Sequence, residues 1–142
     1  MDTTAFDRSI ATLPRASIGF YPTPFHELPT LGQRYGIRLF IKREDMAGPS
    51  AISGSKTRLA EFIIGRAIEQ GVTHLITLGA TLTNSGLQFA IACLRSGITP
   101  ILVLTRNVGN HGPLVDARGN YLLSSLMGVE THVISADRDP WD

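Results

Sequence analysis

The sequence contains a single cysteine, Cys93, which excludes a disulfide within the chain and is typical of a reducing compartment. Cys93 lies in the apolar run 89–94, so we expect a buried structural thiol rather than a nucleophile. No apolar run approaches the roughly 18–20 residues needed to span a bilayer. The segment Met1–Thr4 also lacks the basic and apolar regions of a signal peptide. We therefore expect a cytoplasmic protein that does not contact membranes.

An excess of charge of either sign is also lacking. Thirteen Lys and Arg residues stand against 12 Asp and Glu residues, so the net charge of +1 gives no electrostatic basis for binding nucleic acid. The four histidines show no metal-ligand spacing, so we expect no metal site. The sequence lacks the dinucleotide-binding motif G-x-G-x-x-G, the P-loop motif and the G-x-S-x-G motif. What remains is a 142-residue chain with 43% hydrophobic residues, enough for a globular core.

The second half of the chain alternates between helical and strand patterns. Helices are expected over 56–70, 84–96 and 119–127, strands over 74–79, 100–105 and 129–134, a polar loop over 106–118 and a turn at 136–142. The short connections and apolar strands predict parallel pairing with right-handed crossovers. We therefore expect an α/β three-layer unit around a parallel sheet, with Leu59, Phe62, Ile63 and Ala67 on the buried face of the first helix.

The pattern before residue 56 is weaker. We expect a helical turn near 7–12, a helix over 26–35 and a strand over 38–42 whose partners are not evident in this chain. The charged run 43–45 is interpreted as a solvated turn. The small-residue loop 48–54 can bring backbone N–H groups close to an anion. The chain is thus divided into an N-terminal arm and strand, 1–45, and a small α/β domain, 46–142.

Two polar turns carry the candidate chemistry. The stretch Ser53–Arg58 places Lys56 in the first turn of a predicted helix, where the helix dipole favours a neutral amine able to form a Schiff base. An ordinary surface lysine would explain the same position. Thr83, Asn84 and Ser85 begin the next helix after a buried strand, a position suited to binding a carboxylate or phosphate. Simple N-capping by Thr83 is the alternative.

Six segments of the chain, taken in order, resemble the sequence pattern of one enzyme family. They are Pro22–Pro24, Leu39–Asp45, Ser53–Arg58, Gly79–Ser85, Gly119–Leu123 and Met127–Glu130. The ordered set is similar to the 1-aminocyclopropane-1-carboxylate deaminase / D-cysteine desulfhydrase family, pyridoxal-phosphate enzymes with the tryptophan-synthase-β-like fold. The resemblance runs from about Leu13 to Ile134 and covers the N-terminal half of the family's chain.

The resemblance implies roles for four residues. Lys56 aligns with the lysine that is joined covalently to pyridoxal 5'-phosphate, and Asn84 aligns with the asparagine that hydrogen-bonds the cofactor's 3-hydroxyl. Thr83 stands where the family usually has a serine, whose hydroxyl is catalytic or binds the substrate carboxylate. Ser85 stands where the family has histidine or glutamine. Thr83, Asn84 and Ser85 would together bind the substrate.

The chain also departs from the family pattern. Leu59 replaces a lysine associated with the cofactor phosphate, Ser53 and Ser55 stand in place of glycine and asparagine, and the family's chain is roughly twice as long, as for two ordinary domains. Its second half carries the glycine-rich phosphate loop.

The resemblance therefore implies the lysine-bearing subunit of a split enzyme. This lyase or deaminase would act on a small amino acid by elimination, deamination or replacement, with a second chain completing a hetero-oligomer. An inactive truncated fragment and a non-catalytic module that binds a small ligand are the alternatives.

Overall fold

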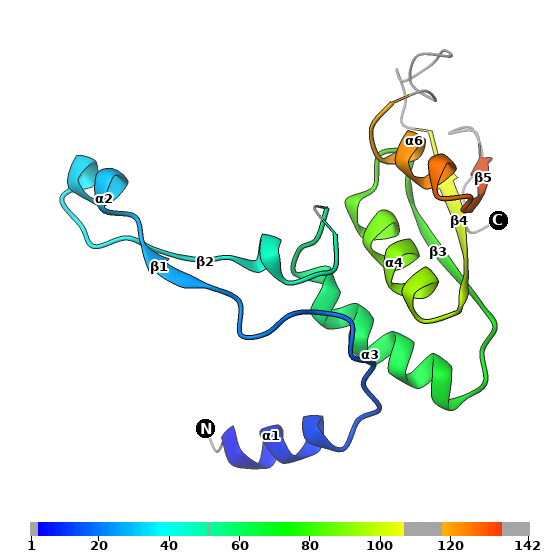
Figure 1. Ribbon diagram of the computed structural model, residues 1–142, viewed down its shortest axis with the longest axis horizontal. Helices are drawn as coiled ribbons and strands as arrows, with labels where there is room; N and C mark the ends of the chain where they lie inside the picture. Colours follow the sequence, from blue (N-terminus) through cyan, green and yellow to red (C-terminus); the bar gives the residue numbers. More distant parts are fainter. Residues whose placement is uncertain (1–2, 51, 107–117, 135–142) are drawn as a thin grey trace.

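A three-stranded parallel sheet organises the C-terminal part of the computed structural model, which describes residues 3–50, 52–106 and 118–134 (Figure 1). The strands are β3 (His74–Ala80), β4 (Thr99–Thr105) and β5 (Glu130–Ile134), in the order β3-β4-β5. Ile76 lies opposite Ile101, and Leu102 lies opposite Thr131. The predicted parallel α/β sheet is confirmed. Most of the loop expected over 106–118 and the turn at 136–142 fall outside the described residues.

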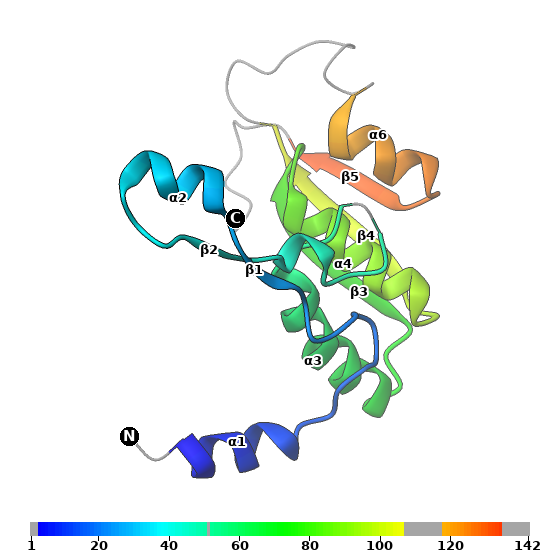
Figure 2. The ribbon, with the colours of Figure 1, turned by 60° about the vertical axis from the view of Figure 1, so that its left-hand side comes forward.

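Three helices accompany the sheet: α3 (Lys56–Glu69), α4 (Asn84–Arg95) and α6 (Gly119–Leu126). Helix α4 packs on the sheet and α6 lies beside it, while α3 packs against α4 (Figure 2). A glycine in the left-handed region follows each helix, at Gly71, Gly97 and Gly128, with φ between 68° and 72°. Because these glycines end the helices sharply, the predicted bounds of all six elements agree with the structure to within one residue.

The core consists of two clusters that meet at α4. One joins α3 to α4 through Ala60, Ile64 and Phe89 and includes Ile18 from the N-terminal arm. The other joins α4 to the sheet through Ala90, Leu102, Leu104 and Val129. Cys93 is fully buried in the first cluster, and burial raises the pKa of its thiol to about 11, which confirms the expected structural thiol.

The buried face of α3 includes Ala67, as predicted, but otherwise differs from the predicted one. Leu59 is 48% exposed and Ile63 is 39% exposed, whereas Ala60 and Ile64 face the core. The arm crosses the helix at Gly65, where an added Cβ would lie 2.6 Å from the backbone of Arg15. Small residues, rather than the largest apolar ones, therefore mark the contact face, because they let the neighbouring backbone approach closely.

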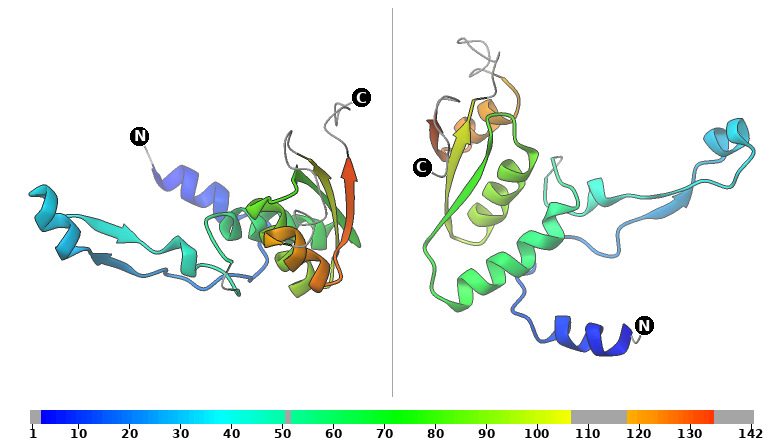
Figure 3. Two further views of the ribbon diagram at one scale, coloured as in Figure 1. Left: turned by 90° about the horizontal axis from the view of Figure 1, so that it is seen from above. Right: turned by 180° about the vertical axis from the view of Figure 1, so that it is seen from behind.

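The N-terminal part contains more regular structure than the sequence predicted. Its elements are α1 (Thr3–Ala11), β1 (Phe25–Glu27), α2 (Pro29–Tyr35), β2 (Phe40–Lys42) and the 3-10 turn η1 (Glu44–Met46). Strands β1 and β2 pair antiparallel and project from the main body as a ribbon (Figure 3). The expectation that the strand over 38–42 lacks a partner is therefore wrong. The helix expected over 26–35 begins only at Pro29, because residues 25–27 pair with β2.

Apolar side chains are exposed on two parts of the molecule. On the ribbon, Phe25 and Phe40 stack with ring centroids 5.4 Å apart and are 65% and 41% exposed. On β3, Ile76 is 63% exposed and Leu78 is 49% exposed, whereas the sheet face toward α4 is covered. Exposed apolar surfaces of this kind are common sites of contact with other layers or other chains. None of the helices in the described ranges combines the length and hydropathy that a transmembrane segment requires.

Candidate active site

The loop that carries Lys56 packs against helix α4. Lys56 is the first residue of α3, and its side chain is exposed. An added Cβ on Gly54 would lie only 3.2 Å from the amide nitrogen of Gln88, which is one turn beyond Asn84 on α4. Within the described residues, no hydrogen bond joins Lys56 directly to Thr83, Asn84 or Ser85. The structure thus brings the loop before Lys56 to the first half of α4, while the lysine amine itself stays accessible.

Thr83 caps α4, as the sequence predicted. It follows β3 with extended backbone angles, and its Oγ1 accepts a hydrogen bond of 3.1 Å from the backbone N–H of Gly86. The turn is tight around this side chain. A Cβ added to Gly86 would lie 2.6 Å from the Thr83 methyl group, and one added to Gly79 would lie 3.0 Å from Thr83 Cβ. Because capping uses the hydroxyl only as an acceptor, Thr83 Oγ1 can still donate to a ligand.

Asn120 contacts Asn84, which sequence reasoning did not assign. Its Nδ2 donates to the Asn84 Oδ1 at 2.6 Å and to the backbone carbonyl of Leu82 at 3.1 Å. Asn120 lies in the first turn of α6, directly after Gly119, so the contact links the starts of two helices that follow adjacent strands. The only signal in the sequence was its place in the Gly119–Leu123 motif.

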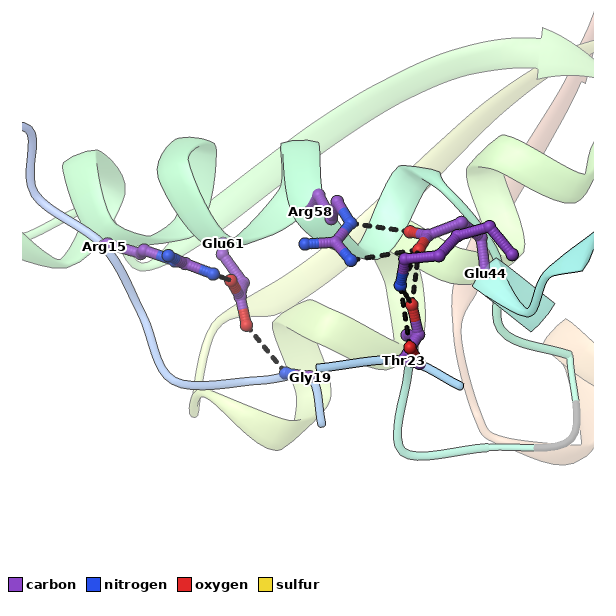
Figure 4. Close-up of polar contacts among 7 residues, drawn as sticks. Arg15, Gly19, Thr23, Glu44, Arg58 and Glu61 are labelled. Carbon is purple, nitrogen blue, oxygen red and sulfur yellow. Dashed lines mark hydrogen bonds and ion pairs between the residues drawn. The ribbon is translucent and has the colours of Figure 1, made fainter. Parts of the chain in front are cut away.

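Glu44 is the centre of a polar cluster beside the first turn of α3 (Figure 4). It accepts hydrogen bonds from Arg58 Nε at 2.6 Å, Arg58 Nη2 at 3.0 Å and Thr23 Oγ1 at 2.6 Å, and the Lys42 amine lies 3.3 Å away. The bonds from Arg58, then that from Thr23, lower the pKa of Glu44 to about 2. The interpretation of residues 43–45 as a solvated turn is therefore wrong for Glu44, although Arg43 and Asp45 do form an exposed pair.

Glu61 fixes the N-terminal arm to the same helix (Figure 4). Its carboxylate is 1% exposed; Oε1 accepts from the backbone N–H of Ile18 at 3.2 Å and of Gly19 at 2.7 Å. Its Oε2 accepts from Arg15 Nε at 2.7 Å. Arg58 and Glu61 both lie within two turns of Lys56 on α3, so the two clusters hold the start of this helix at two points along the arm.

The chain belongs to the family of pyridoxal-phosphate dependent enzymes, because the family model matches residues 16–142. Within that class it is similar to proteins named for one activity. It is 34% identical over 136 residues to a protein of Pyrococcus abyssi that is provisionally named a 1-aminocyclopropane-1-carboxylate deaminase, covering 96% of this chain and 38% of that protein. It is 33% identical over 129 residues to the 1-aminocyclopropane-1-carboxylate deaminase of Burkholderia lata, covering 89% of this chain and 38% of that protein.

A solved structure supports the same relationship. The crystal structure of a homologue of 1-aminocyclopropane-1-carboxylate deaminase matches with a TM-score of 0.77 and 31% identity, over 93% of this chain and 38% of that one. The resemblance and the fold class expected from the sequence are therefore confirmed. The chain spans about 38% of the length of these relatives.

The residues present fit one side of pyridoxal phosphate, the cofactor of this family. An accessible primary amine, an amide group and a hydroxyl suit the cofactor's aldehyde, its 3-oxygen and a substrate carboxylate, respectively. Leu59, by contrast, offers no charge to the phosphate. In the described part of the chain, no group of three or more His, Cys, Asp or Glu side chains could hold a metal ion. The assignments of Lys56, Thr83, Asn84 and Ser85 remain predictions.

Proposed function

We propose that this chain is the lysine-bearing part of a pyridoxal-phosphate dependent deaminase or lyase that acts on a small amino acid. The observation that carries the proposal is the packing of the Lys56 loop on α4 through Gly54 and Gln88. This packing supports the proposal, because it joins the loop before Lys56 to the helix whose first residues follow Thr83. The membership of the chain in a family that uses this cofactor supports the same function.

Each residue then has a definite task. Lys56 Nζ would hold the cofactor through its aldehyde group and would carry a proton to or from the substrate. Asn84 would donate a hydrogen bond to the cofactor's 3-oxygen. Thr83 Oγ1, with Ser85 and the first N–H groups of α4, holds the substrate carboxylate, because a helix start favours an anion. Pyridoxal phosphate, when bound, supplies an electron sink for the bond broken at the substrate α-carbon.

A second chain that supplies the phosphate loop and the missing layers is part of the proposal. The exposed Phe25, Phe40, Ile76 and Leu78 support it, because apolar surfaces of this kind are usually covered in a working assembly. The absence of a charge at Leu59 supports it too, since the phosphate then needs its cations or N–H groups from elsewhere. We propose a hetero-oligomer located in the cytoplasm, where the lone buried thiol of Cys93 stays reduced.

Reductive trapping tests the cofactor assignment sharply, because the chain has only two lysines, Lys42 and Lys56. The protein purified from its own source, with any chain that accompanies it, is incubated with pyridoxal phosphate, reduced with borohydride and mapped by peptide mass. Lys42 is a matched control, since its amine donates to the Thr23 carbonyl at 2.9 Å and lies beside Glu44. We expect the adduct on Lys56, retained in Lys42→Arg and lost in Lys56→Arg. Equal labelling of both lysines, or none, would contradict the assignment.

Native mass spectrometry of the same preparation tests the second chain. A stoichiometric complex that releases ammonia from 1-aminocyclopropane-1-carboxylate or D-cysteine would support the split enzyme. A lone chain without adduct would favour an inactive fragment. A lone chain that binds a small anion equally well after Lys56→Ala would favour a non-catalytic binding module.

A further inference from the structure

We infer that Asn120 is a positioning residue that fixes the side-chain amide of Asn84 with its N–H group, rather than its carbonyl, facing outward. The inference rests on the proposed function, because the outward N–H is the group that would donate to the 3-oxygen of pyridoxal phosphate. It assigns to the start of α6 a part in the cofactor site.

The orientation follows from which atoms can donate and which can accept. The carbonyl of Leu82 only accepts, so the Asn120 atom that contacts it at 3.1 Å must be the amide nitrogen. The same nitrogen lies 2.6 Å from the Asn84 side chain, which must therefore present its oxygen. The nitrogen of Asn84 then points the other way. The oxygen and nitrogen ends of the Asn84 amide have nearly the same shape. Without Asn120, either end could therefore face outward.

Asn120 is itself well fixed. It follows Gly119, which has a φ of 59° and where an added Cβ would lie 3.2 Å from the Leu82 side chain. Its neighbour Tyr121 packs on the core cluster between α4 and the sheet. Ser124 Oγ donates to the backbone carbonyl of Asn120 at 2.9 Å. Asn84, in contrast, is exposed, so its order depends on the partner across the turn.

The consequence for the cofactor is electrostatic. An N–H group aimed at the 3-oxygen stabilises that oxygen as an anion, whereas a carbonyl aimed at it would repel it. Loss of this donor would raise the affinity of the 3-oxygen for a proton. The pH midpoint of the cofactor's absorbance change should therefore rise when the orientation is lost, and the cofactor should bind more weakly.

A double-mutant cycle tests the inference on the protein as it assembles, with its completing chain present. The dissociation constant of pyridoxal phosphate and the pH midpoint of its absorbance are measured for Asn84→Ala, Asn120→Ala and the double variant. We expect Asn120→Ala to weaken binding by about 3- to 10-fold and Asn84→Ala by about 10-fold or more. The double variant should be no worse than Asn84→Ala, since Asn120 acts through Asn84. Effects that multiply in the double variant would overturn the inference.

Two further variants separate positioning from simple packing. Asn120→Asp keeps the shape but can only accept, so it would turn the Asn84 amide round and present its carbonyl to the cofactor. It should therefore weaken binding more than Asn120→Ala does. Ser125→Ala is the matched control, because Ser125 is exposed and donates to the backbone carbonyl of Tyr121, and it should change neither quantity. An Asn120→Asp protein that binds the cofactor like wild type would refute the role.

A readout without cofactor distinguishes failure of this inference from failure of the proposed function. In nuclear magnetic resonance spectra of the cofactor-free protein, the side-chain amide signals of Asn84 should shift in Asn120→Ala but not in Ser125→Ala. Unchanged Asn84 signals would overturn the contact itself. A shift in these signals together with a wild-type protein that takes up no pyridoxal phosphate would remove the proposed function, and with it the cofactor role of Asn120.

Discussion

Replacing Glu61 should release the N-terminal arm from α3. The carboxylate is almost fully buried, yet three of its hydrogen-bond donors, the Arg15 guanidinium and the N–H groups of Ile18 and Gly19, come from the arm. Ile18 is 2% exposed and belongs to the core cluster between α3 and α4. A change at Glu61 should therefore affect the packing of the core as well as the attachment of the arm.

The size of the effect follows from what each variant leaves unpaired. Glu61→Ala leaves the N–H groups of Ile18 and Gly19 without acceptors, at about 1–3 kcal/mol for a fully buried donor. Gly19 is half-buried and Arg15 is 47% exposed, so water can replace part of the loss at both. We expect a total of about 2–4 kcal/mol. Glu61→Gln keeps an oxygen for the two N–H groups but loses the charge toward Arg15, so about 1–2 kcal/mol is expected.

Two assays report the loss. Urea unfolding of the assembled protein measures the free energy of unfolding, and limited proteolysis measures the local release of the arm. Glu69→Gln is the matched control on the same helix, because its exposed pair with Arg66 should contribute less than about 0.5 kcal/mol. If Glu61→Ala matches Glu69→Gln in both assays, the reasoning that the buried carboxylate holds the arm is wrong.

Two other predictions concern Glu44 and the Thr83 turn. Since the folded state lowers the pKa of Glu44 to about 2, its carboxylate stabilises the fold above the ordinary carboxyl range and loses this effect as pH falls toward 2. Urea midpoints of wild type and Glu44→Gln should therefore differ at neutral pH and converge in acid; a constant difference would contradict this. Gly86→Ala should cost about 1–3 kcal/mol in urea unfolding because of the Thr83 methyl group, and adding Thr83→Ser should restore most of it. No recovery in the double variant would show that the strain lies elsewhere.

The second half of the fold could be predicted because its signals are local. Glycine follows each helix, the strands are short and apolar, and the order of elements allows few topologies. The ribbon of β1 and β2 gave no such signal, since each strand has only three residues and their pairing spans the whole of α2. The buried face of α3 was missed for another reason. A charged residue, Glu61, and a glycine, Gly65, occupy it, and both are explained only by the arm that crosses there.

The candidate site also combines a local contact, which the sequence predicted, with a long-range contact, which it did not. Capping by Thr83 depends on residues within one turn, so the sequence predicted it. The contact between Asn120 and Asn84 joins residues 36 positions apart and required the sheet order. Strands β3 and β4 are parallel neighbours in the sheet. The helices that follow them therefore both begin at the same, carboxyl edge of the sheet. Polar residues that begin α4 and α6 are therefore neighbours whatever the length of the intervening loop. Asn120 meets this condition, because it lies in the first turn of the helix that follows β4, next to β3 in the sheet.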